Sequence, residues 1–74
     1  MSDPTEAIRE QLMASNQDYQ RLREEHARYA SQLEQLASKT YLSEQEKLEE
    51  IRLKKLKLRV KDRMEMLVQR ARVS

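Results

Sequence analysis

Apolar residues recur along the first half of the chain at alternating intervals of four and three residues. This heptad spacing continues for more than four repeats and places the side chains on one stripe of an α-helix, which packs against a partner along that stripe. Ser15 and His26 are its polar positions and therefore its weak points. We call this stripe the first-helix seam; its residues are Ile8, Leu12, Ser15, Tyr19, Leu22, His26, Tyr29, Leu33 and Leu36.

Capping sequences mark where two helices begin. Asp3, Pro4 and Glu6 form a start signal, because Asp can cap a helix and the missing N–H of Pro costs nothing in the first turn. Ser43 with Glu46 is a second capping box, and it follows a hydroxyl-rich stretch that interrupts the seam. A link this short usually joins antiparallel neighbours. We therefore predict one all-α domain over residues 1–74, an antiparallel two-helix hairpin with helices at about 4–37 and 44–72 and a link at about 38–43.

Two apolar stripes run along the second predicted helix. Although residues 56–61 alternate apolar and basic side chains as a strand does, no turn residue flanks them and a helical period continues through them. If the chain folds back near its middle, residues whose numbers sum to about 82 lie level, so that Tyr19 meets Met64. The inner stripe, which completes this hairpin seam, is Leu53, Leu56, Val60, Met64, Leu67 and Ala71.

The other stripe lies on roughly the opposite side of the second predicted helix from the inner stripe, because successive residues of an α-helix are rotated by about 100° around its axis. We call it the outer stripe; its residues are Leu48, Ile51, Leu58 and Met66. One partner helix cannot cover both stripes. We therefore predict a homo-oligomer, most simply a dimer in which two hairpins form a four-helix bundle, with any other protein partner unknown.

Composition excludes several classes of protein. The 74 residues include no Cys and no Gly, so the chain lacks the ligands of a zinc cluster and the loop of a phosphate cradle. A bundle-type metal site needs Glu-x-x-His, but Arg23 occupies the Glu position ahead of His26. We predict that the protein is not an enzyme and binds no metal or cofactor. Because no apolar run is long enough to span a bilayer and no signal peptide is recognisable, we expect a cytoplasmic protein without a membrane span.

Some seam residues allow a second interpretation. We interpret His26, the only His, as a polar group within the helix interface, with a pH-sensitive or recognition role as the alternative. Tyr19 and Tyr29 are interpreted as core residues rather than stacking platforms. Met64 and Met66 are interpreted in the same way, although paired methionines also suit an adaptable docking surface.

Charge is distributed unevenly between the two halves of the chain. Residues 1–37 carry four basic and seven acidic side chains, whereas residues 38–74 carry eleven basic and six acidic ones. The basic stretch consists of Lys54, Lys55, Lys57, Arg59, Lys61 and Arg63. We interpret these residues as flanking the seams, with their stems buried and their charges partly neutralised by Asp18, Glu24 and Glu25. The alternative is anion binding, to nucleic-acid phosphates, an anionic membrane or an acidic protein.

Several of these residues carry a resemblance to a known family. The matching segments are Tyr19-x-x-Leu22-x-x-x-His26, Leu33-x-x-Leu36, Ser43-Glu44 and Lys54-Lys55-x-Lys57-Leu58-x-Val60-Lys61-Asp62-x-Met64. On these segments the chain resembles the YdcH-like family of small, uncharacterised bacterial proteins, a coiled-coil-like domain of unknown function. The chain departs from that pattern at Val60, where leucine is usual, and at Arg63, where the family tends to have an acid. The resemblance implies an α-hairpin and brings no catalytic residues.

These patterns predict a non-enzymatic, oligomerising helical hairpin that acts as an adaptor or assembly element. The alternative function is that of a nucleic-acid-associated accessory protein, which would use the basic stretch from Arg52 to Arg63.

Overall fold

The computed structural model of the protein describes residues 4–73, which form three α-helices and no strand. The helices are α1 (Pro4–Ser15), α2 (Gln17–Ala37) and α3 (Glu44–Val73). The all-α class is therefore confirmed over this part of the chain. The expected two-helix hairpin is wrong in one respect, because the first predicted helix is divided in two. Asp3, the expected cap of that helix, lies outside the described residues.

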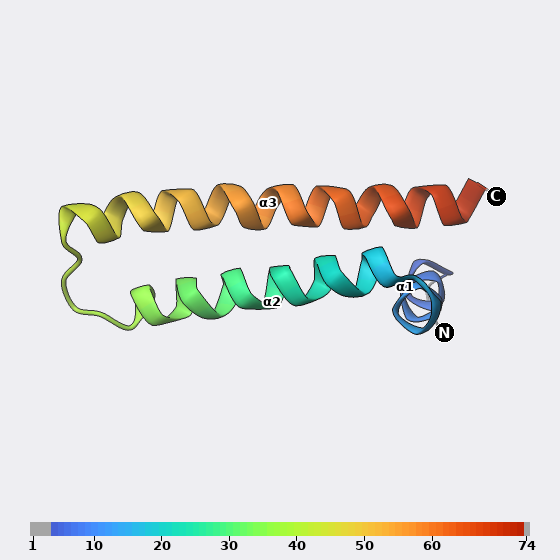
Figure 1. Cartoon of the computed structure of the whole chain (residues 1–74), viewed down its shortest axis with the longest axis horizontal. Helices are drawn as coiled ribbons and strands as arrows, with labels where there is room; N and C mark the ends of the chain where they lie inside the picture. The colour runs from blue at the N-terminus through green and yellow to red at the C-terminus, as the bar shows by residue number, and fades with distance from the viewer. Residues whose placement is uncertain (1–3, 74) are drawn as a thin grey trace.

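α2 and α3 lie side by side in opposite directions and form the long hairpin of the molecule (Figure 1). The 30 residues of α3 give it a length of about 45 Å. The longest extent of the chain is 47 Å, so α3 runs from one end of the molecule to the other. α2 has only 21 residues and pairs with part of that length.

The link between α2 and α3 ends at Ser43, and the capping box predicted for Ser43 and Glu46 is confirmed. The Ser43 N–H donates to Glu46 Oε1 at 3.0 Å, and the Glu46 N–H donates to Ser43 Oγ at 3.2 Å. Lys39 Nζ forms an ion pair with the other carboxylate oxygen of Glu46. The hydrogen bond from Lys39, with those from Ser43, lowers the pKa of Glu46 to about 2. The start of α3 is therefore held by a carboxylate that stays charged well into the acid range.

The break in the first predicted helix occurs at Asn16. Its backbone is extended, with φ −111° and ψ 111°, and its Oδ1 accepts a hydrogen bond of 2.9 Å from the Tyr19 N–H, which makes it the N-cap of α2. At the other side of the break, Gln20 Nε2 donates to the Met13 carbonyl oxygen at 2.6 Å, near the end of α1. These side-chain bonds satisfy backbone groups that a continuous helix would have paired internally.

α1 turns away from the axis of α2 and lies at the open end of the hairpin, near the C-terminal end of α3 (Figure 1). Arg9 on α1 donates to Glu65 on α3, with 2.6 Å between the Arg9 guanidinium nitrogen and Glu65 Oε1. α1 therefore covers a part of α3 that α2 would have covered if the two had formed one straight helix.

The core lies along the inner faces of α2 and α3. Its buried side chains are Tyr19, Leu53, Val60 and Val68. The predicted inner stripe has Leu67 where the structure buries Val68, while Leu67 is only half-buried. Arg9 and Glu65 line one groove together with Val68, and their ion pair places α1 on the Val68 side of α3. Of the remaining seam residues, Ser15 is exposed and the others are half-buried; the half-buried ones are Ile8, Leu12, Leu22, His26, Tyr29, Leu33, Leu36, Leu56, Met64 and Ala71.

Candidate interaction surface

The exposed large apolar residues of the described chain are concentrated on α3. They comprise the whole predicted outer stripe, with Leu48 67%, Ile51 51%, Leu58 59% and Met66 56% exposed. Val73, seven residues after Met66, extends the stripe toward the C-terminal end of α3. Tyr41 in the link is also exposed, but no residue of α1 or α2 as described belongs to this group. α3 therefore carries five of the six exposed large apolar residues of the described chain.

The outer stripe faces away from α2. Counting about 100° per residue from the buried Leu53, Ile51 and Leu58 lie about 160° and 140° around the helix. Leu48 and Met66 lie about 140° around in the other direction. The stripe is therefore centred opposite the inner face, where no other helix of residues 4–73 lies against it.

Two charged residues interrupt the outer stripe. Lys55 and Asp62 both lie within about 20° of its centre and are seven residues apart. Neither forms an ion pair with any residue in the range 4–73. Lys55 was expected only as part of the basic stretch and Asp62 was given no role, although their spacing of seven residues places both on one face of a helix.

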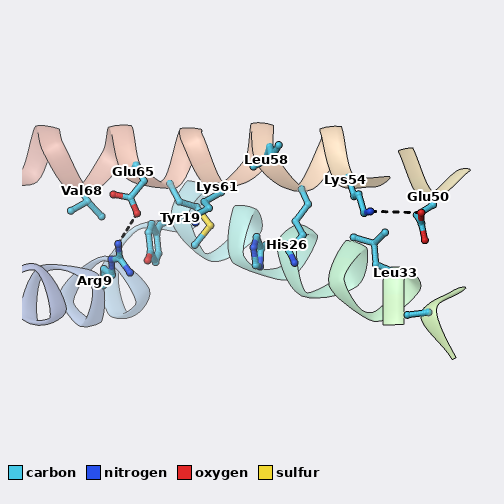
Figure 2. Close-up of a pocket in the computed structure, with 13 residues that line it drawn as sticks. Arg9, Tyr19, His26, Leu33, Glu50, Lys54, Leu58, Lys61, Glu65 and Val68 are labelled. Carbon is cyan, nitrogen blue, oxygen red and sulfur yellow. Dashed lines mark hydrogen bonds and ion pairs between the residues drawn. The ribbon is translucent and has the colours of Figure 1, made fainter. Parts of the chain in front are cut away.

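A long groove lies between α2 and α3 on one side of the hairpin (Figure 2). Its volume is about 860 Å³, and Tyr19, His26 and Leu33 of α2 line it together with Met64 and Val68 of α3. No group of three or more His, Cys, Asp or Glu side chains within residues 4–73 is placed to hold a metal ion. The groove thus has an apolar floor with a single imidazole, and the charged side chains that also line it are Arg9, Glu50, Lys54, Lys57, Lys61 and Glu65.

The basic stretch is divided into two ridges along the sides of α3. Lys54, Lys57 and Lys61, which we call the lysine ridge, line the groove just described. Arg59 and Arg63 line a hollow that also contains Leu22 and Tyr29, on the opposite side of the hairpin. By helical position Arg52 belongs with these two, and we call the three the arginine ridge. The outer stripe runs between the two ridges, and Lys55, the remaining residue of the basic stretch, lies within that stripe.

The charges on the ridges are not neutralised in the way expected. Lys54 pairs with Glu50 at 3.7 Å, and Arg52 pairs with Glu49 at 3.2 Å, so both ion pairs lie within α3 (Figure 2 shows the first). Asp18, Glu24 and Glu25 were expected to neutralise part of this charge; none of the three forms an ion pair with α3 in residues 4–73, although Glu25 lines the same hollow as Arg59 and Arg63. Most of the positive charge of α3 therefore faces solvent.

None of the helices in residues 4–73 is both long enough and apolar enough to cross a membrane. No family model matches the chain, and no curated protein or solved structure matches it either. The resemblance to the YdcH-like family accordingly stays a prediction, and the surface of α3 has to be interpreted from its own residues.

Proposed function

We propose that the protein is a non-enzymatic assembly element, which associates with a second copy of itself through the outer stripe of α3. The observation that supports this proposal is the exposure of Leu48, Ile51, Leu58 and Met66 on one face of one helix. Apolar surface gains about 25 cal/mol for each Å² removed from water, and contiguous apolar patches on soluble proteins commonly mark interaction sites. A dimer is the simplest assembly that covers the stripe on every copy.

In this proposal the two α3 helices form the contact between copies. Because the stripe faces away from α2, the two α2 helices lie on the outside of the pair. The four-helix assembly expected from the sequence then has its long helices in the order α2, α3, α3 and α2. Each copy keeps its own core between α2 and α3, and the new contact adds a second apolar layer.

The basic ridges predict how this association depends on salt. The lysine and arginine ridges lie at the two edges of the stripe, so the ridges of two copies approach each other at the rim of the contact. Salt screens this repulsion, with a Debye length of about 10 Å at 0.1 M and 3 Å at 1 M. Self-association should therefore strengthen as salt is raised. Binding to nucleic acid or to an acidic protein should weaken over the same range, because those contacts are attractive.

Sedimentation of the wild-type chain and of Leu58→Asp tests the proposal. Leu58 is 59% exposed, so burying the rest of its side chain in both copies contributes about 2 to 4 kcal/mol to the dimer. The substitution should weaken the dimer at least about 30-fold. Tyr41→Asp is the matched control, since it places the same charge on an exposed apolar residue outside α3 and should leave the dimer unchanged.

A wild-type chain that remains a folded monomer at high concentration and high salt would overturn the proposal. Equal weakening by Leu58→Asp and Tyr41→Asp would contradict the location of the contact. Circular dichroism of both variants shows whether their helices are intact, so that a loss of association is not mistaken for a loss of folding.

A further inference from the structure

We infer that the second copy binds antiparallel to the first, with α3 against α3 in a single register, so that Lys55 of each copy pairs with Asp62 of the other. This inference rests on the proposed self-association and specifies its geometry. It follows from two features of the outer stripe, namely its apolar positions and its two charged positions.

The charged positions exclude a parallel arrangement. In a parallel, in-register pair each residue of the stripe faces its own copy, so Lys55 would face Lys55 and Asp62 would face Asp62 inside the contact. Like charges placed opposite each other at an interface disfavour binding strongly. An antiparallel pair instead brings each Lys55 to an Asp62, and both residues lack an ion-pair partner within residues 4–73 of their own chain.

The same register pairs the apolar residues. If Lys55 is level with Asp62, residues whose numbers sum to about 117 lie level along the two helices. Ile51 of each copy is then level with Met66 of the other, and the two Leu58 side chains meet beside the two-fold axis. Shifting either helix by one heptad breaks the charge pairing, because an Asp62 or a Lys55 then faces itself or an uncharged residue.

Disulfide cross-linking tests the register directly, because the chain contains no Cys. A disulfide needs Cα atoms within about 7 Å, so it reports which positions face each other. Leu58→Cys should cross-link to itself on mild oxidation. Ile51→Cys and Met66→Cys should each fail to form a disulfide with a second copy of the same variant but should cross-link to one another when the two variants are mixed. Self-cross-linking of Ile51→Cys as efficient as that of Leu58→Cys indicates a parallel pair and overturns the inference.

Charge exchange gives an independent measurement. Lys55→Asp alone should weaken the dimer roughly tenfold or more, because it creates two contacts between like charges across the axis. Adding Asp62→Lys in the same chain restores both pairs with their signs reversed and should return the dissociation constant to within about threefold of the wild type. Failure of the double variant to recover overturns the register.

The two proposals fail in different ways. If the wild type dimerises and Leu58→Asp weakens the dimer, but the cross-linking or charge exchange disagrees, the surface is correct and the register is wrong. If the wild type does not self-associate at any salt concentration, both proposals are wrong, and the stripe has to be tested against a partner of another kind.

Discussion

Leu53 and Leu48 provide a matched test of the two faces of α3. They are the same residue type on the same helix, but Leu53 is 2% exposed on the inner face and Leu48 is 67% exposed on the outer stripe. Changing either one to Ala removes three carbon atoms. At about 0.8 kcal/mol for each buried carbon, Leu53→Ala loses about 2.4 kcal/mol before any cavity is counted, and buried Leu→Ala changes generally cost 2 to 5 kcal/mol.

The same change at Leu48 should cost the single chain much less. About a third of its side chain is covered, which corresponds to about 0.8 kcal/mol, and the higher helix propensity of Ala offsets part of this loss. In a dimer, however, the rest of Leu48 becomes buried in both copies. The cost of Leu48→Ala should therefore grow with protein concentration, while the cost of Leu53→Ala should stay large at every concentration.

Urea denaturation followed by circular dichroism, at about 5 µM and about 200 µM protein, measures both effects. Leu53→Ala should lower the free energy of unfolding by at least about 2 kcal/mol at the lower concentration, and Leu48→Ala by less than about 1 kcal/mol. Equal losses for the two variants at the lower concentration would refute the assignment of inner and outer faces. A loss for Leu48→Ala that does not depend on concentration would refute its burial in a dimer.

The helix boundaries and the charged surface give three further tests. Asn16→Ala removes the N-cap of α2 and should lower the free energy of unfolding by about 1 kcal/mol in urea, whereas Asn16→Asp keeps a capping oxygen and should change it by a few tenths; equal losses would argue against the cap. Glu46→Gln keeps a capping oxygen but removes the charge that binds Lys39. Since the pKa of Glu46 is lowered from 4.5 to about 2, its contribution is fully present above the higher value and is lost as the pH falls toward the lower one. The melting temperature of the wild type should therefore exceed that of Glu46→Gln at pH 7, and the two should converge near about pH 2; a difference that does not change with pH would be inconsistent with the ion pair. Generic DNA and RNA should bind weakly at about 150 mM salt, because the lysine and arginine ridges lie on opposite sides of α3; tight binding that falls steeply with salt and is weakened by Lys57→Glu would support the nucleic-acid alternative instead.

Local sequence signals were sufficient to predict α3 but not the break before α2. The capping box of Ser43 and Glu46 is a contact between near neighbours, so it can be recognised in the sequence and appears in the structure. The heptad spacing, in contrast, continues through Ser15 without a gap. Asn16 fits both a helix interior and an N-cap, and the choice depends on side-chain bonds such as that from Gln20 to the Met13 carbonyl.

The position of α1 also explains why part of the core was not predicted. Val68 is buried on the side of α3 where α1 lies, and no pattern within α3 alone indicates that direction. The common face of the outer-stripe residues could be predicted, because it follows from their spacing along one helix. Their exposure could not be predicted, because it depends on whether the rest of the chain covers that face.

The break at Asn16 divides the molecule into parts of unequal stability. The structure describes every residue of α1, and none of them is buried. The ion pair between Arg9 and Glu65 is partly exposed and contributes at most about 1 kcal/mol to stability. α1 can therefore detach in a local opening that leaves the hairpin folded, and its amide hydrogens should exchange with solvent before those of α2 and α3. Each such opening breaks the ion pair with Glu65 and removes α1 from the side of α3 that carries Val68, so the stability of α1 determines how often this end of α3 lacks its neighbour.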